Sequence, residues 1–400
     1  MAQPFEAADS RSERTGYWLF LSHLATVFSI SISTILLGVT VLSLPWTRRR
    51  PVRWAELEPL LIPLGLYVLL LAGSIVASYD PATSVRGVTE VFTLLTLLLA
   101  PLLVRGERQV RLAVDVLVFV AALLACSGLS QYFVGYGDID RRIRGSFSHY
   151  MTFSGVLLIG DLLLVASMVY GDRWRSPWRW GALAVINVAL LGSYTRNAWV
   201  ALALTLTVLV VLRAPRLLLA YVPAAVLFVV LAPVPLLHRA ASIVDLRDSS
   251  NYDRLCMLEA GLAMIHERPL FGLGPELVER RYPIYRSPAA PRYDVPHLHN
   301  NLLQLAAERG LPALGSYLAL TVAALAVAWR GYAREGRRAG PRADLYVGAM
   351  LALLAFNLAG LFENNWGDTE VQRVVLFVLA IPFCLREPAA GASPKLLHRT

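Results

Sequence analysis

The sequence predicts an all-helical protein that crosses a membrane many times. Hydrophobic residues make up 56% of the 400 residues and charged residues only 16%, which is too apolar for a soluble domain of this length. Apolar runs of membrane-spanning length recur from one end of the chain to the other. The short alternating segments typical of a β-barrel are not seen, so helices are expected throughout.

The first apolar run, Tyr17–Trp46, is too long for one span of about 20 residues and too short for two full spans. Read as a short helical pair, it gives about twelve spans with both termini cytoplasmic. Most arginine-rich loops then fall on the cytoplasmic side, as the positive-inside rule requires. The other runs are Pro59–Ser78, Val85–Val104, Val110–Val134, Met151–Tyr170, Trp180–Ser193, Asn197–Leu212, Leu217–Pro235, Ala313–Trp329, Leu345–Phe362 and Val371–Leu385.

This topology divides the chain into three parts. Residues 1–235 hold spans one to nine with short loops, 236–310 form a large outer loop with amphipathic helices, and 311–400 hold the last three spans and a cytoplasmic tail. Arginines in the loop 135–150 and in the large loop fall on the outer side, against the orientation rule. We therefore expect them to serve another purpose there.

The stretch HLHNNLLQLAAERGLPALG is the most unusual polar segment of the chain. It places His299 near the start of a helix that runs through Glu308, before Gly310 and Pro312 break it. The positive end of the helix dipole disfavours a second positive charge on an imidazole, and a neutral imidazole suits general-base work. His299 is the candidate base, with His297 and Asn300 in support.

We expect no metal and no cofactor. His297 and His299 could form a zinc pair, but no third ligand stands at a matching spacing. The pair Asp138 and Asp140 could hold a divalent ion beside a diphosphate. Arginines follow them directly and can supply the same electrostatic stabilisation.

Two further arginines lie at the predicted outer boundary. Arg196 stands in a very short turn between apolar runs, where a charge is costly unless it is paired or faces a polar cavity. Arg254 lies near the start of a predicted helix that Pro269 ends. That helix carries an apolar stripe at helical spacing, made of Leu255, Leu258, Leu262 and Ile265.

Asp161 lies near the middle of an apolar run, where an acid normally faces other protein and has a partner. It could bond to Asn187, or it could belong to a proton path. The second possibility keeps a membrane transporter or flippase as an alternative function, although no internal repeat is seen.

The polar segments together resemble the O-antigen ligase and polymerase superfamily. HNNLLQLAAERGLPALG is similar to its histidine motif and SYTRNAWVAL to its Thr-x-Arg segment. RLCMLEAGLAMIHERPLFGLGP resembles the stretch that closes on Pro-Leu-Phe-Gly-x-Gly, and RGSFSHYMTFSG resembles a segment that precedes them. The glycine spacing after His299 is looser than the family's tightest pattern. The order of the four motifs and the span layout agree with the family over nearly the whole chain.

This resemblance implies an inverting glycosyltransferase of GT-C type in the bacterial inner membrane, with its active site on the periplasmic face. The donor would be a glycan on undecaprenyl diphosphate, and the acceptor the core oligosaccharide of lipid A. His299 would be the base, and Arg196 and Arg254 would bind the diphosphate, with Arg142 and Arg144 as further candidates. Membrane lipids are expected partners and nucleic acid is not. An O-antigen polymerase is the alternative, but only one clear R-x10-G match, Arg144 to Gly155, begins in a predicted outer loop.

Overall fold

The computed structural model describes residues 11–47, 54–135, 142–245, 248–336 and 340–386, and these residues form helices and connecting loops with no strand among them. In chain order the longer helices are α1 (Arg11–Ala25), α2 (Ile30–Ser43), α3 (Trp54–Val76), α5 (Val88–Leu103), α6 (Gly106–Phe133), α7 (Tyr150–Val169), α8 (Pro177–Gly192), α9 (Arg196–Arg213), α10 (Tyr221–Leu231), α11 (Val234–Ala241), α12 (Ser249–Glu267), α13 (Val278–Tyr285), α14 (Asn301–Arg309), α15 (Leu311–Arg334), α16 (Ala343–Ala359) and α17 (Thr369–Cys384). Short turns, α4 (Pro81–Ser84), η1 (Val85–Gly87) and η2 (Pro215–Ala220), precede α5 and α10. Every predicted apolar run falls on a helix.

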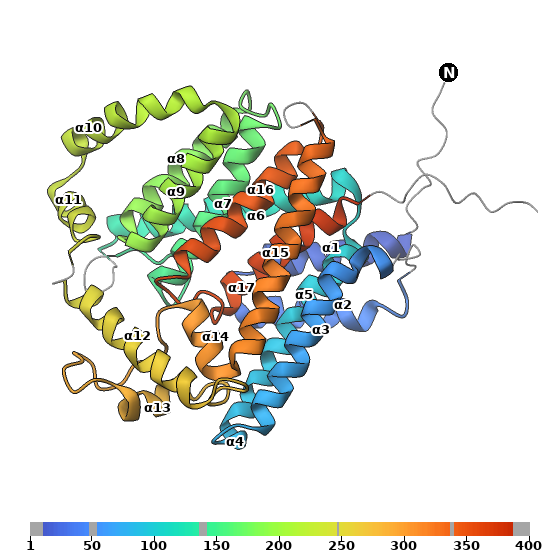
Figure 1. The fold of residues 1–400 in the computed structure, drawn as a ribbon. Helices are drawn as coiled ribbons and strands as arrows, with labels where there is room; N and C mark the ends of the chain where they lie inside the picture. Colours follow the sequence, from blue (N-terminus) through green and yellow to red (C-terminus); the bar gives the residue numbers. More distant parts are fainter. Residues whose placement is uncertain (1–10, 48–53, 136–141, 246–247, 337–339, 387–400) are drawn as a thin grey trace, which may run out of the picture.

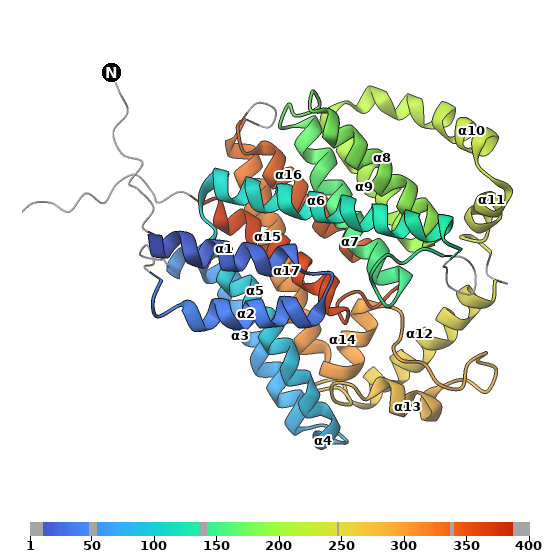
Figure 2. The same ribbon diagram turned by 180° about the vertical axis from the view of Figure 1, so that it is seen from behind.

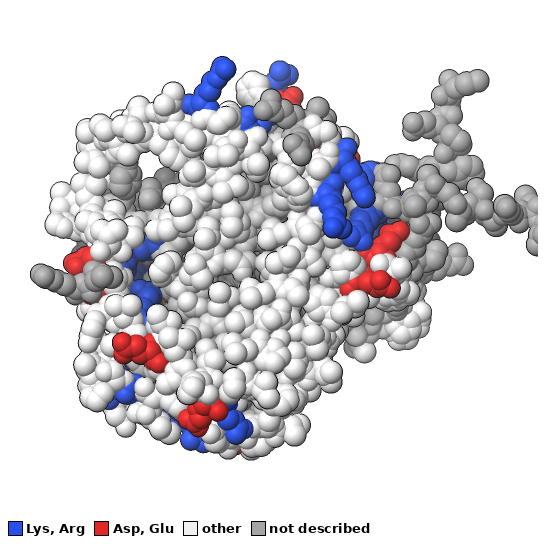
Figure 3. Space-filling model, viewed as in Figure 1, with Lys and Arg blue, Asp and Glu red and all other residues white. Residues whose placement is uncertain are grey.

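Six of the described helical segments are long and apolar enough to cross a membrane. They are Trp54–Val76, Pro81–Leu103, Gly106–Phe133, Tyr150–Val169, Arg196–Arg213 and Leu311–Arg334. The run Tyr17–Trp46 is a pair of adjacent helices, α1 and α2, each shorter than a full span, as expected for a helical pair. Figure 3 shows a broad uncharged band across one face, with charged side chains gathered near its edges. The chain is thus a multi-pass membrane protein, and the larger count of twelve spans stays a prediction.

Helices α7 and α16 form the centre of the bundle, with α6, α9 and α17 around them (Figures 1 and 2). Nearly all of α7 and α17 is buried, which is why their sequences are apolar on every side. Small residues allow close helix contacts, because a side chain at Gly160 would place its Cβ 2.6 Å from Ala121. The core of the protein therefore lies between helices that are far apart in the sequence.

Helices α12, α13 and α14 form a smaller layer at one end of the bundle (Figure 1). They share a hydrophobic cluster that includes Met257, Met264 and Tyr282. On the apolar stripe of α12, Leu255, Leu258 and Leu262 are exposed and do not pack over the other helices. The smaller residues Cys256, Ala260 and Gly261 pack inward instead, because α14 approaches closely there. The leucines are left on the outer surface.

The loop after α12 is fixed to the end of α14. Leu273 and Gly274 donate backbone hydrogen bonds to Ala307 and Glu308, at 2.9 and 3.0 Å. Gly272 (φ +67°) and Gly274 (φ +113°) adopt backbone angles that favour glycine, and a Cβ at Gly272 would lie 2.3 Å from the Glu308 backbone. The Pro-Leu-Phe-Gly-x-Gly sequence thus holds α14, and the histidines before it, against the bundle.

Candidate active site

Residues from five separate stretches of the chain meet where the bundle joins the smaller layer. Tyr150 begins α7, Arg196 begins α9 and Arg254 lies near the start of α12. His299 lies just before α14, and Glu363 lies in the loop between α16 and α17. No spacing in the sequence connects this loop to His299.

His299 is held by a buried carboxylate. Its Nδ1 lies 3.0 and 3.2 Å from the two oxygens of Glu363, whose side chain is 4% exposed. Burial alone would raise the pKa of Glu363, but its hydrogen bond to His299 and the charges of both histidines lower that pKa to about 2. Since an ionised carboxylate has no proton to give, Nδ1 of His299 carries the hydrogen. The basic lone pair is then on Nε2.

The backbone at His299 is strained. Its φ of +48° lies in the left-handed region, which a residue with a side chain rarely adopts. Asn300 caps α14 by accepting from the Leu303 N–H at 3.0 Å and donates to Leu361 O at 3.0 Å. Asn301 N–H donates to Gly360 O at 2.7 Å. The bonds to Leu361 and Gly360 tie the histidine segment to the loop that carries Glu363.

His297 lies beside His299, with ring centres 4.3 Å apart. Burial lowers the pKa of His297 to about 4, so its ring is neutral near pH 7. Its Nδ1 accepts from the His299 N–H at 3.3 Å, and its Nε2 lies 3.6 Å from Glu363. Ligand atoms of His297, His299 and Glu363 all lie within 4.8 Å of one another, so these three residues could hold a metal ion. The prediction of no metal rested on the lack of a third ligand near the two histidines, and Glu363 can supply that ligand. The other candidate metal ligands, Asp138 and Asp140, lie outside the described residues.

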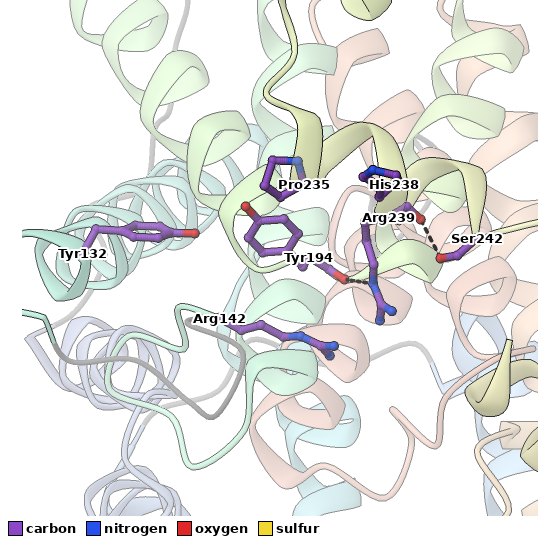
Figure 4. Close-up of a pocket in the computed structure, with 7 residues that line it drawn as sticks. All are labelled: Tyr132, Arg142, Tyr194, Pro235, His238, Arg239 and Ser242. Carbon is purple, nitrogen blue, oxygen red and sulfur yellow. Dashed lines mark hydrogen bonds between the residues drawn. The ribbon is translucent and has the colours of Figure 1, made fainter.

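Two adjoining cavities beside His299 are rich in arginine. One, of about 120 Å³, is lined by Arg196, Arg239 and Arg254, together with Tyr194 and Phe362. The other, of about 670 Å³, shares Tyr194 and Arg239 with it and adds Arg142 (Figure 4). We call the two together the arginine pocket. Arg144 lines neither cavity and donates to Ser148 O at 3.0 Å within its own loop.

The arginines of this pocket differ in how much of each guanidinium is already bonded. Arg196 donates to Ser242, Asp248 and Asn251 at 2.7 to 3.1 Å and is 8% exposed, so it holds the segment between α11 and α12 in place. Arg254 donates through Nε to Phe362 O at 3.2 Å and through Nη1 to Ser250 at 2.8 Å. Among the described residues its Nη2 has no hydrogen-bond partner and is available to a ligand.

Arg239, on α11, was not singled out from the sequence. Its Nε donates to Tyr194 O at 3.2 Å, while its terminal nitrogens have no protein partner among the described residues. Burial, and then the positive charges of Arg142 and Arg196, lower the pKa of Arg239 to about 10. Figure 4 shows the side chains of Arg142 and Arg239 extending into the same space. Like charges held together in this way favour an anion between them.

Asp161 lies away from this site. It is buried in the middle of α7, roughly 16 Å along the helix from Tyr150. Asn187 donates to one of its oxygens at 2.8 Å, which is one of the two possibilities drawn from the sequence. Among the residues that the structure describes, the other oxygen has no hydrogen-bond partner.

One family model matches the chain. It is described as O-antigen ligase and covers residues 180–318, a stretch that contains Arg196, Arg239, Arg254 and His299. No curated protein matches the sequence. Over residues 180–318, about a third of the chain, the sequence is therefore similar to the O-antigen ligase family.

Proposed function

We propose that the protein is an O-antigen ligase. In this role it would transfer O-antigen polysaccharide from undecaprenyl diphosphate to the core oligosaccharide of lipid A, at the periplasmic face of the bacterial inner membrane. The observation that carries the proposal is a histidine oriented by a buried carboxylate next to an arginine pocket. A base and an anion site side by side are what this displacement requires.

The reaction is a single displacement. Nε2 of His299 takes the proton from an acceptor hydroxyl as the hydroxyl oxygen forms a bond to the anomeric carbon of the donor. The bond from that carbon to the diphosphate breaks, and the diphosphate oxygen keeps the electron pair. Attack from the side opposite the leaving group inverts the anomeric centre. Glu363 stabilises the imidazolium that forms, because its carboxylate lies 3.0 Å from Nδ1.

The diphosphate leaving group would lie in the arginine pocket. Arg239 and the free Nη2 of Arg254 offer donors without giving up protein bonds, and Arg142 contributes charge from the adjoining cavity. Arg196 has fewer free donors, because its guanidinium already donates to Ser242 and Asp248. Charge developing on the diphosphate is therefore met by preorganised cations.

The orientation in the membrane is supported by the charges at the opposite end of the bundle. There, Arg111 pairs with Asp344 at 2.6 Å, and Arg173 and Arg179 both pair with Asp115. These arginines belong to loops that the positive-inside rule assigns to the cytoplasm. The active site, at the other ends of α7 and α16, would then face the periplasm.

The test is a lipopolysaccharide gel from a strain that lacks the gene, complemented with wild type or with His299→Ala, together with extraction of polyprenyl-linked glycan. A ligase with His299 as its base predicts that the variant loses the ladder on lipid A while long polymer accumulates on the polyprenyl carrier. A single repeat unit left on lipid A would instead identify an O-antigen polymerase, which the family match accommodates equally.

A transporter or flippase predicts the reverse pattern of mutational effects. It would lose function with Asp161→Asn and tolerate His299→Ala. The bond from Asn187 to Asp161 supports a packing role for this acid, because a carboxylate fixed by an amide within the bundle needs no translocated ligand. An unchanged ladder with His299→Ala would remove the catalytic role given to that histidine.

A further inference from the structure

A second cavity adjoins the histidines and has the opposite charge. It encloses about 200 Å³ and is lined by four carboxylates, Glu276, Glu279, Glu308 and Asp368, together with His297 and Asn364. A larger cavity of about 590 Å³ continues it, since the two share Glu276, Arg309, Trp366 and Gly367. We call these two cavities the acidic chamber.

The acidic chamber and the arginine pocket lie on either side of one short segment. Phe362 lines the arginine pocket, Asn364 lines the acidic chamber, and Glu363 between them binds His299. A displacement with inversion needs its nucleophile and its leaving group on opposite sides of the anomeric carbon. A base between two cavities meets this requirement when one cavity holds the leaving group and the other holds the attacking sugar.

The charge of the chamber disfavours a diphosphate, and the terminal nitrogens of Arg373 in its larger part already donate to Ile30 and Thr34. Arg309 is the cation in its smaller part, and both terminal nitrogens are already engaged, with Glu90 at 2.7 Å and Glu308 at 2.9 Å. Glu276 and Glu279 are exposed, and neither carboxylate has an ion pair or side-chain hydrogen bond in the part of the chain that the structure describes. Two free acceptors and a net negative charge suit a ligand that donates hydrogen bonds.

Two buried acids of the chamber, Asp368 and Glu308, have raised pKa values. Burial and the charge of Glu363 raise the pKa of Asp368 to about 7. Burial, against the nearby charge of Arg309, raises the pKa of Glu308 to about 7. An ammonium group placed beside these acids would favour their ionised form and would be stabilised by it.

We propose that the acidic chamber is the acceptor subsite, and that it takes a terminal sugar that is uncharged or carries an amino group and rejects a phosphorylated one. This inference rests on the proposed transferase function. The acceptor hydroxyl would reach Nε2 of His299 from the chamber, with Glu276 and Glu279 accepting hydrogen bonds from neighbouring hydroxyl or amino groups. The arginine pocket would remain for the donor.

The first test measures binding without transfer. Full-length His299→Ala protein in nanodiscs is titrated with two core oligosaccharides that differ only in a phosphate on the terminal sugar. We expect the neutral one to bind at least about 10-fold more tightly, and Glu276→Gln with Glu279→Gln to weaken its binding by roughly 10-fold. The matched control is Glu259→Gln, an exposed acid on α12 outside both cavities. Equal binding of the two sugars, or no effect of the double substitution, would overturn the proposal.

The second test uses the catalytically competent protein in liposomes with a polyprenyl-diphosphate glycan as donor. The double glutamine variant should raise the KM for the neutral acceptor by roughly 10-fold while the KM for the donor stays the same. Charge reversal with Glu279→Lys should allow a phosphorylated acceptor to be used. Equal transfer to neutral and phosphorylated acceptors would refute the subsite but not the ligase function. Selective binding with no transfer to either acceptor would refute the ligase function but not the subsite.

Discussion

Replacing Glu363 by glutamine tests whether the buried carboxylate drives proton transfer at His299. The substitution keeps the shape of the side chain and an oxygen that can accept from Nδ1–H, but it removes the negative charge 3.0 Å away. The pKa of Glu363 lies at about 2 instead of 4.5. That difference corresponds to about 3 kcal/mol of net stabilisation of the ionised carboxylate in the folded protein, after the cost of its burial.

If this interaction stabilises the imidazolium in the transition state, Glu363→Gln should lower kcat by roughly 100-fold with little change in the KM for the donor. Because the negative charge beside the base is lost, the dependence of kcat on pH should also change. Glu363→Asp, which keeps the charge, should recover part of the rate. The assay is transfer of fluorescent glycan from polyprenyl diphosphate by purified protein in liposomes.

The matched control is Glu370→Gln, which changes another buried carboxylate at the start of α17 with no hydrogen bond or ion pair to either histidine. Both variants should keep the thermal unfolding temperature within a few degrees of each other. A Glu363→Gln enzyme with wild-type kcat and an unmoved pH profile would show that the carboxylate only packs beside His299. Glu363 would then not orient His299 so that Nε2 acts as the base.

Three other predictions follow from the charges around the site. Arg239→Ala should lower kcat/KM for the donor by 10- to 100-fold, because the terminal nitrogens of Arg239 are free to bind the diphosphate. Its control is Arg280→Ala, at an exposed arginine on α13, which should change kcat/KM by less than about two-fold. Removal of divalent ions with a chelator should leave transfer unchanged, and loss of activity that zinc restores would instead assign His297, His299 and Glu363 as a metal site. The pKa of Asp368 is raised, so between about pH 4 and 7 the folded protein keeps a proton that the unfolded chain has released. The free energy of unfolding that this group contributes therefore falls as pH rises through that window. Asp368→Asn should therefore gain in unfolding temperature relative to wild type from pH 5 to pH 8, and a constant difference would contradict the shift.

The helices could be predicted from the sequence because each apolar run is long and bounded by polar or breaking residues. The position of His299 could be predicted for the same reason, since Asn300 caps α14 and Gly310 ends it. The role of Glu363 could not be predicted, because 64 residues separate it from His299. The packing of α16 against α7 brings its loop to the site. Local patterns report on neighbours along the chain, and this contact is not local.

Arg239 escaped prediction for a different reason. It follows the last predicted span of the first part, in a short helix whose other residues, apart from His238, are apolar or small. A lone arginine at the end of a membrane run is usually a snorkelling side chain, so its sequence gives no sign of a ligand site. Its burial beside Arg142 and Arg196, visible only in the fold, is what distinguishes it.

The placement of charge around Glu363 also constrains the direction in which substrates approach. The carboxylate that orients His299 repels a diphosphate from the base itself, and the acidic chamber extends that repulsion to the side of Asn364. The arginine pocket on the side of Phe362 attracts the diphosphate. A donor bound in the reverse sense would place its diphosphate among Glu276, Glu279 and Asp368, with no free cation to balance it among the described residues that line that cavity. In the proposed reaction, the segment Phe362 to Asn364 would therefore orient the base, separate the two substrates and set the side from which the anomeric carbon is attacked.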